Sequence, residues 1–133
     1  MKSIQSLLLV DDDSFYQFAT RSIIQQTALV SQVKIFSNGL DAINFLRAIR
    51  HKPKELPQVI LLDIFMPVMD GWEFLEEYKA LQLKPEKPIV IYMVSSSIDP
   101  RDIERVRTIP SVSGYIIKPI TRERFLELLK TVH

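Results

Sequence analysis

Charged and hydroxyl side chains follow four short apolar runs of this sequence, each at the point where the run ends. They are Asp11 and Asp12 after Leu-Leu-Leu-Val, Asp63 after Val-Ile-Leu-Leu, Ser95 after Ile-Val-Ile-Tyr-Met-Val, and Lys118 after Tyr-Ile-Ile. Continuous apolar runs of this length are typical of buried strands in a parallel sheet, and ligands bind beyond the carboxyl ends of such strands. If the runs are parallel neighbours, three carboxylates, a hydroxyl and an ammonium meet in one crevice. Such a crevice suits a divalent cation and a phosphoryl group.

The three successive aspartates at positions 11–13 predict a cation site. A single aspartate before a helix is usually an N-cap, and we assign that role to Asp13. Two further carboxylates at the end of the strand exceed what capping needs, so Asp11 and Asp12 are the candidate ligands. Because the ligands are all oxygen and only a few are carboxylates, Mg²⁺ fits better than a caged Ca²⁺ or a soft metal.

Asp63 is the candidate nucleophile. Beside Asp11 and Asp12 its charge is repelled unless a cation is present, and a cation-screened carboxylate can attack phosphorus to form an aspartyl phosphate. Phosphoryl transfer then needs in-line positioning of the reacting groups and positive charge near the phosphoryl oxygens. Lys118 could supply this charge, and Ser95 could donate a hydrogen bond from its hydroxyl. Two simpler interpretations stay open: Lys118 as a solvated lysine, and Ser95 as part of an ordinary turn.

The elements that must position these residues alternate between strand and helix five times, which predicts an α/β fold with a parallel sheet. The strands are expected at residues 6–10, 33–36, 58–62, 89–94 and 112–117. Lys34 in the second run and Ser113-Gly114 in the fifth indicate edge strands. The doubly wound order 2-1-3-4-5 satisfies this and makes the strands that end at Asp11 and Asp63 neighbours.

Apolar residues at helical spacing predict which faces of the helices are buried. The first helix is expected to bury Phe15, Phe18, Ala19 and Ile23. The fourth helix, near Pro100 to Arg107, has the weakest apolar stripe, formed by Ile103 and Val106.

The composition fits one domain over residues 1–133, and no output domain is expected after the last helix. With 17 Lys and Arg against 16 Asp and Glu, the net charge of +1 gives no reason to expect nucleic acid or a membrane as partner. Cysteine is absent, and the apolar runs are too short to span a bilayer or form a signal peptide, so a cytoplasmic location is expected. The three glycines cannot form a Gly-rich phosphate loop, so a phosphate must be held by metal and side chains.

Four segments together resemble the receiver domains of two-component response regulators, including the stand-alone, chemotaxis-regulator-like type. They are Leu7-Leu-Leu-Val-Asp-Asp-Asp13, Ile60-Leu-Leu-Asp-Ile-Phe-Met-Pro-Val-Met-Asp-Gly71, Met93-Val-Ser-Ser96 and Gly114-Tyr-Ile-Ile-Lys-Pro119. The match covers essentially the whole chain in order and spacing. The resemblance implies a flavodoxin-like fold, and the family is itself an example of the 2-1-3-4-5 order.

The resemblance also implies a role for each site residue. Asp63 is the phosphoacceptor, Asp12 binds Mg²⁺ directly, Asp11 binds it directly or through water, and the backbone carbonyl of Phe65 completes the protein ligands. Ser95 and Lys118 contact the phosphoryl group, and Tyr115 is the aromatic switch residue that responds with Ser95. Phe65 and Ser97 occupy the two positions that tune the phosphoryl lifetime, and the Lys118-Pro119 peptide is expected to be cis.

The implied function is a phosphoacceptor in a phosphorelay. A histidine kinase or histidine phosphotransfer protein would donate the phosphoryl group, and the domain would signal through the face formed by the fourth helix, the fifth strand and the last helix. It would catalyse only its own modification, and we do not class it as an enzyme. The alternatives are a docking module that no longer uses phosphate, and a Mg²⁺-dependent phosphatase, which usually has a second acid where Phe65 stands.

Overall fold

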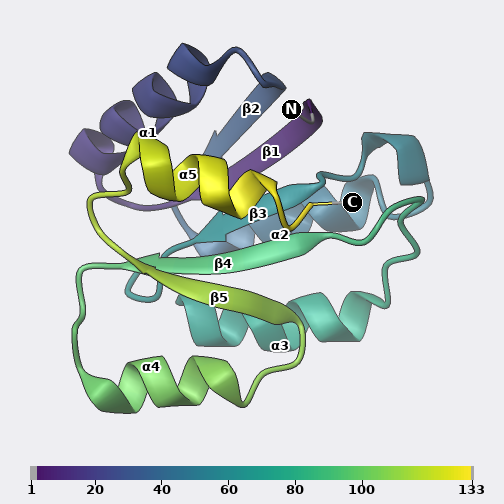
Figure 1. Ribbon diagram of the computed structural model, residues 1–133. Coiled ribbons are helices and arrows are strands. Elements are labelled where there is room, and N and C mark those ends of the chain that lie inside the picture. The colour runs from purple at the N-terminus through teal and green to yellow at the C-terminus, as the bar shows by residue number, and fades with distance from the viewer. Residues whose placement is uncertain (1–2, 133) are drawn as a thin grey trace.

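Five strands form one parallel sheet in the order β2-β1-β3-β4-β5 in the computed structural model, which describes residues 3–132 (Figure 1). The strands are β1 Ile4–Val10, β2 Val30–Phe36, β3 Val59–Leu62, β4 Val90–Ser95 and β5 Val112–Ile117. The predicted order is confirmed, with β2 and β5 at the edges. β1 and β2 begin earlier than predicted because Ile4 pairs with Val30, beyond the polar residues that interrupt both apolar runs.

Helices cover both faces of the sheet, so the central strands are buried on both sides. The helices are α1 Ser14–Thr27, α2 Gly39–Ala48, α3 Gly71–Leu81, α4 Pro100–Arg107 and α5 Arg122–Leu129, with a short 3-10 helix, η1 Pro53–Glu55. Alternate strand residues belong to two cores: Leu8, Ile60 and Met93 pack with α2, α3 and α4, whereas Leu7, Leu61 and Tyr92 pack with α1 and α5. Figure 1 shows α1 and α5 together on one side of the sheet and α3 and α4 on the other. Within residues 3–132, no helix is long and apolar enough to cross a membrane.

The buried face of α1 differs from the prediction. Phe15 and Phe18 are 68% and 76% exposed, whereas Thr20 and Ile24 are the buried residues of this helix. Ile24 shares a core with Phe125 of α5. The predicted stripe was wrong for Phe15 and Phe18, whereas Ile23 packs against the same core as predicted and Ala19 is half-buried. The buried face is shifted toward Thr20 and Ile24, which have the same helical spacing.

The other helices bury apolar residues against the sheet, and α4 has the small buried face that its weak stripe predicts. Phe74 of α3 and Phe125 of α5 are fully buried, and Val106 is the single buried residue among the eight of α4. α4 therefore has a small buried apolar face, and polar contacts help to hold its amino end. Asp99 caps that end by accepting a hydrogen bond from the Arg101 amide.

Candidate functional site

Asp11 and Asp63 leave the sheet side by side because β1 and β3 are in register up to their ends, where Val10 pairs with Leu62. The Asp63 amide donates a hydrogen bond of 2.9 Å to the Val10 carbonyl oxygen, which continues the pairing by one residue. Carboxylate oxygens of Asp11, Asp12 and Asp63 lie within 4.8 Å of one another. Asp11 and Asp63 are buried and Asp12 is exposed, so the cluster is open to solvent on one side.

Lys118 reaches this cluster from the end of β5. Its Nζ lies 2.8 Å from Asp11 Oδ2 and 3.0 Å from Asp63 Oδ2, and only 6% of its side chain is exposed. Its backbone amide donates to the Ser95 carbonyl oxygen at 2.9 Å, and the Tyr16 ring centroid lies 4.6 Å from Nζ. The Lys118-Pro119 peptide is cis, as predicted. The alternative of a solvated lysine does not hold for this structure.

The acidic cluster contains more negative than positive charge. Burial raises the pKa of Asp63 from 3.8 to about 6; Lys118 opposes this rise and the charge of Asp11 adds to it. Burial lowers the pKa of Lys118, but hydrogen bonds and charge from Asp11 and Asp63 outweigh burial and leave that pKa raised. With Asp12, three carboxylates face one ammonium, so the ionised cluster carries a charge of −2.

This donor set fits a divalent cation such as Mg²⁺. All three side chains offer carboxylate oxygens, the exposure of Asp12 leaves room for water ligands, and the charge of −2 balances a divalent ion. Mg²⁺ is also the ion that the resemblance to receiver domains implies for these acidic residues. Phe65 lies two residues after Asp63 and is 58% exposed. That its backbone carbonyl is a further ligand remains a prediction.

Local hydrogen bonds fix the chain around the aspartates. Asp13 is the N-cap of α1, as predicted: its carboxylate accepts from the Phe15 amide at 2.9 Å. The Asp13 amide in turn donates to Asp11 Oδ1 at 2.9 Å, and the Gln17 side chain donates to the Asp11 carbonyl oxygen. The contact of Gln17 with Asp11 was not predicted from the sequence. Gln17 lies one helical turn after the N-cap Asp13, and this position could have indicated that its side chain reaches back toward the aspartates.

The loop between β3 and α3 holds Asp63 from the other side. The Ile64 amide donates to Asp63 Oδ1 at 2.8 Å, and the Gly71 amide donates to the Ile64 carbonyl oxygen at 2.7 Å. A Cβ at Gly71 would collide with the Asp63 carbonyl oxygen, so only glycine allows this close approach. Val68, in the same loop, has a positive φ of 68°, which is strained for a β-branched residue.

Ser95, Ser97 and Tyr115 form a second group beside the acidic cluster. Ser95 is 1% exposed at the end of β4, and its Oγ accepts from the Ser97 amide at 3.2 Å. The Tyr115 hydroxyl donates to the Ser97 carbonyl oxygen at 2.7 Å, and Ser97 Oγ donates to Asp102 of α4 at 2.8 Å. The predicted switch residues are therefore linked through Ser97 to α4. Sequence reasoning missed Asp102, whose partner depends on the loop conformation.

The fold and the acidic crevice together define a receiver-type module, and comparison with known proteins gives the family. A family model, the response regulator receiver domain, matches residues 7–130, and the chain belongs to this family. The chain is thus the receiver domain of a two-component response regulator. Receiver domains are signalling modules that interact with histidine kinases and downstream targets, and their homologues that are enzymes act through other domains.

Individual relatives support this membership. A two-component response regulator from Cytophaga hutchinsonii is 31% identical with a TM-score of 0.84, over 97% of this chain and 96% of that one. CheY from Borrelia burgdorferi, solved in a complex with CheX, BeF₃ and Mg²⁺, is 19% identical with a TM-score of 0.75, over 96% of this chain and 87% of that one, and shows the same fold. The probable methanogenesis regulatory protein FilR2 of Methanothrix harundinacea is 28% identical over 95% of this chain and 77% of its own length. The chain spans only about half the length of several other curated relatives.

Proposed function

We propose that this domain accepts a phosphoryl group on Asp63 from the phosphohistidine of a histidine kinase or histidine phosphotransfer protein. The observation that carries the proposal is the position of the Lys118 ammonium, within 3.0 Å of carboxylate oxygens of both Asp63 and Asp11 in a buried acidic cluster. A carboxylate whose charge is destabilised by burial gains from bonding to phosphorus. The ammonium beside it is placed to contact the negative oxygens of the incoming group.

In the transfer, Asp63 Oδ2 forms a bond to phosphorus as the bond between phosphorus and the histidine nitrogen breaks. The nitrogen keeps the electron pair and takes a proton from solvent. Lys118 exchanges its contact with Asp63 for one with a phosphoryl oxygen while Asp11 keeps it in place, and the Ser95 hydroxyl donates to another oxygen. Mg²⁺ held by Asp11, Asp12, Asp63 and the Phe65 carbonyl would neutralise further charge on these oxygens.

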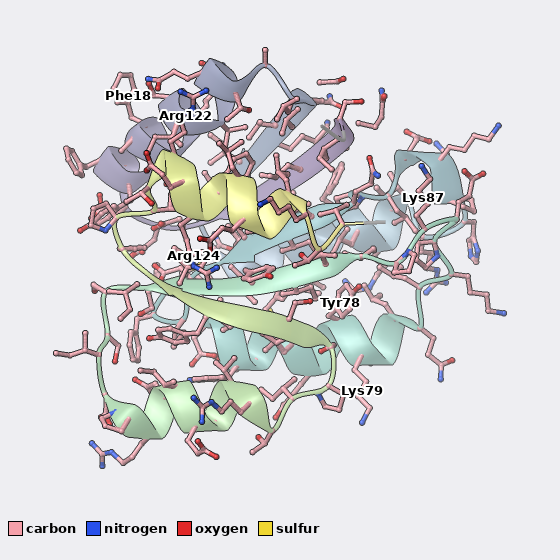
Figure 2. The ribbon with its side chains drawn as sticks, viewed as in Figure 1. Phe18, Tyr78, Lys79, Lys87, Arg122 and Arg124 are labelled. Carbon is pink, nitrogen blue, oxygen red and sulfur yellow. The ribbon has the colours of Figure 1, made fainter. Side chains whose placement is uncertain are left out.

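Exposed apolar side chains around the crevice offer a docking surface for the phosphodonor. Phe15 and Phe18 on α1, Phe65 and Val68 after β3, and Ile98 after β4 are all more than half exposed, and all belong to segments at the carboxyl edge of the sheet. Phe18 points away from α1 into solvent in Figure 2. Exposed apolar side chains are typical of protein-protein interfaces, and here they would guide the phosphohistidine toward Asp63.

The phosphorylated domain would signal through the face formed by α4, β5 and α5. A phosphoryl group that draws the Ser95 hydroxyl away from the Ser97 amide changes the loop to which Tyr115 and Asp102 are bonded. Because α4 buries only Val106, a change in that loop can shift the helix at a small cost in packing. A protein target would then meet a different surface.

The proposal includes a domain in the cytoplasm that modifies only itself and acts on no external substrate. A docking module independent of phosphate is the second candidate, but the retained ion pairs among Asp11, Asp63 and Lys118 give it no support. An aspartate-nucleophile phosphatase lacks the second acid, because Phe65 occupies its position.

Intact-mass measurement tests the proposal. Incubation with Mg²⁺ and acetyl phosphate should add one phosphoryl group to the native domain and none to Asp63→Asn. Asp12→Asn, which weakens the cation site but keeps the nucleophile, should be modified more slowly. Equal phosphorylation of the Asp63→Asn variant and the native domain would refute the assignment.

A further inference from the structure

A cleft of about 580 Å³ lies between α3 and the segment that contains the end of α4 and the loop after it. Its apolar lining comes from Trp72, Leu75, Tyr78, Leu83, Ile109 and Pro110. None of the residues that line it belongs to the acidic crevice. A mostly apolar cleft with a few polar groups, within the range of about 300–1,000 Å³, is typical of small-molecule sites.

The cleft carries a guanidinium that lacks a carboxylate partner. α4 has three arginines: Arg101 forms an ion pair with Asp99 and Arg107 with Glu104, whereas Arg105 forms no ion pair within residues 3–132. The Arg105 guanidinium carbon instead lies 4.1 Å from the Trp72 ring centroid. Stacking uses the face of a guanidinium, and its N–H donors, which lie in the plane, stay available for a planar anion such as a carboxylate.

A neutral hydroxyl provides a second polar contact. Burial raises the pKa of Tyr78 to about 12, so its phenol keeps its proton at neutral pH. Its ring stacks on Phe74, with centroids 6.1 Å apart, and its hydroxyl has no hydrogen-bond partner in the part of the chain that the structure describes. The lining therefore offers the phenol hydroxyl of Tyr78 next to aromatic surface, besides the aliphatic hydroxyls of Thr108 and Ser111.

The charge of the lining limits the class of ligand. Arg105 and Lys79 are cationic and Glu76 is anionic, which gives the lining a net charge of +1. Lys79 extends away from α3 in Figure 2. A ligand with one negative charge and a flat apolar body matches this arrangement.

We propose that the cleft between α3 and α4 binds a planar aromatic monocarboxylate, whose ring packs against Trp72 and Leu75 and whose carboxylate accepts hydrogen bonds from Arg105. Such a ligand contacts α3 and the carboxyl end of α4 at once. It would therefore restrain the helix whose amino end is bonded to Ser97 through Asp102. The cleft shares no residue with the acidic crevice, so this inference does not rest on the proposed phosphoacceptor function.

The test uses 2-naphthoate as the probe, with calorimetry for affinity and backbone amide shifts for location. Trp72 is the only tryptophan of the chain, so its indole N–H gives a single resonance that should shift on binding. Loss of a charge-assisted hydrogen bond is worth about 1.5–3 kcal/mol, so Arg105→Ala should weaken binding at least about tenfold. The neutral analogue 2-naphthamide should bind the native domain more weakly by a similar factor.

Arg101→Ala is the matched control, because it removes an exposed arginine from the same helix outside the cleft. It should change the affinity less than twofold. The proposal is overturned if Arg105→Ala and Arg101→Ala bind equally well, if the shifts lie away from α3 and α4, or if the native domain shows no binding up to the solubility of the probe. Far-ultraviolet circular dichroism of both variants establishes that each is folded before these comparisons are made.

Discussion

Replacing Asp63 by asparagine should stabilise the metal-free domain at neutral pH. The carboxyl has a pKa of 3.8 when unfolded and about 6 when folded, chiefly because of burial. At about 1.4 kcal/mol for each pKa unit, ionised Asp63 destabilises the fold by about 3 kcal/mol. The Asp63 carboxylate accepts a hydrogen bond from the Ile64 amide on one oxygen and from Lys118 on the other. Asparagine has only one side-chain oxygen, so one of these hydrogen bonds is lost at a cost of about 1 kcal/mol. The net gain at pH 8 is therefore about 2 kcal/mol.

The pH dependence separates this cause from others. Because the folded state binds the proton more tightly, the Asp63 contribution to stability is lost as the pH rises from about 4 through 6. Asp63→Asn does not titrate, so its advantage over the native domain should grow by about 2 kcal/mol between pH 4 and pH 8. Urea unfolding with EDTA, followed by the fluorescence of Trp72, measures the difference.

Glu86→Gln is the control, because it neutralises an exposed carboxylate outside the cluster. Its stability relative to the native domain should vary by less than about 0.5 kcal/mol over the same range. A stability difference for Asp63→Asn that stays constant with pH, or that grows as the pH falls, would refute the electrostatic reasoning.

Three further substitutions test the contacts around the crevice by urea unfolding in EDTA. Lys118→Ala leaves the buried carboxylates of Asp11 and Asp63 without their cation and should cost about 3 kcal/mol; a loss below about 1 kcal/mol would mean that the ion pairs are weak. Gly71→Ala should destabilise by more than about 2 kcal/mol, because its Cβ meets the Asp63 carbonyl oxygen, and an unchanged midpoint would contradict that contact. Val68→Gly should stabilise by about 1 kcal/mol by relieving a positive φ, so a destabilised variant would show that the native loop is not strained.

Sheet topology was predictable because a few residues decide it. Lys34 and Ser113-Gly114 identified the edge strands, and the order that follows from them makes the strands before Asp11 and Asp63 neighbours. Once the order is known, the proximity of these two carboxylates follows from the geometry of parallel strands. The same argument predicted that Lys118 would approach the cluster, although not that it would bond to both carboxylates.

Other features could not be predicted, because they depend on packing between segments. The buried face of α1 was misassigned because an apolar count favours Phe15 and Phe18 over Thr20, whereas close packing against the sheet favours the short side chain. The bonds that Ser97 makes to Tyr115 and Asp102 depend on the path of one loop. Helical periodicity alone did not separate the two possible buried faces of α1, and it contains no information on the hydrogen bonds of Ser97.

Chemical trapping of the phosphorylated residue tests the central claim most directly. Borohydride reduces an aspartyl phosphate to homoserine, and peptide mass spectrometry then locates the reduced residue. After incubation with Mg²⁺ and acetyl phosphate, the proposed function predicts homoserine at position 63 and unmodified aspartate at positions 11, 12 and 13. Homoserine at any of those three positions, or an unmodified Asp63 in a sample that carries phosphate, would contradict it.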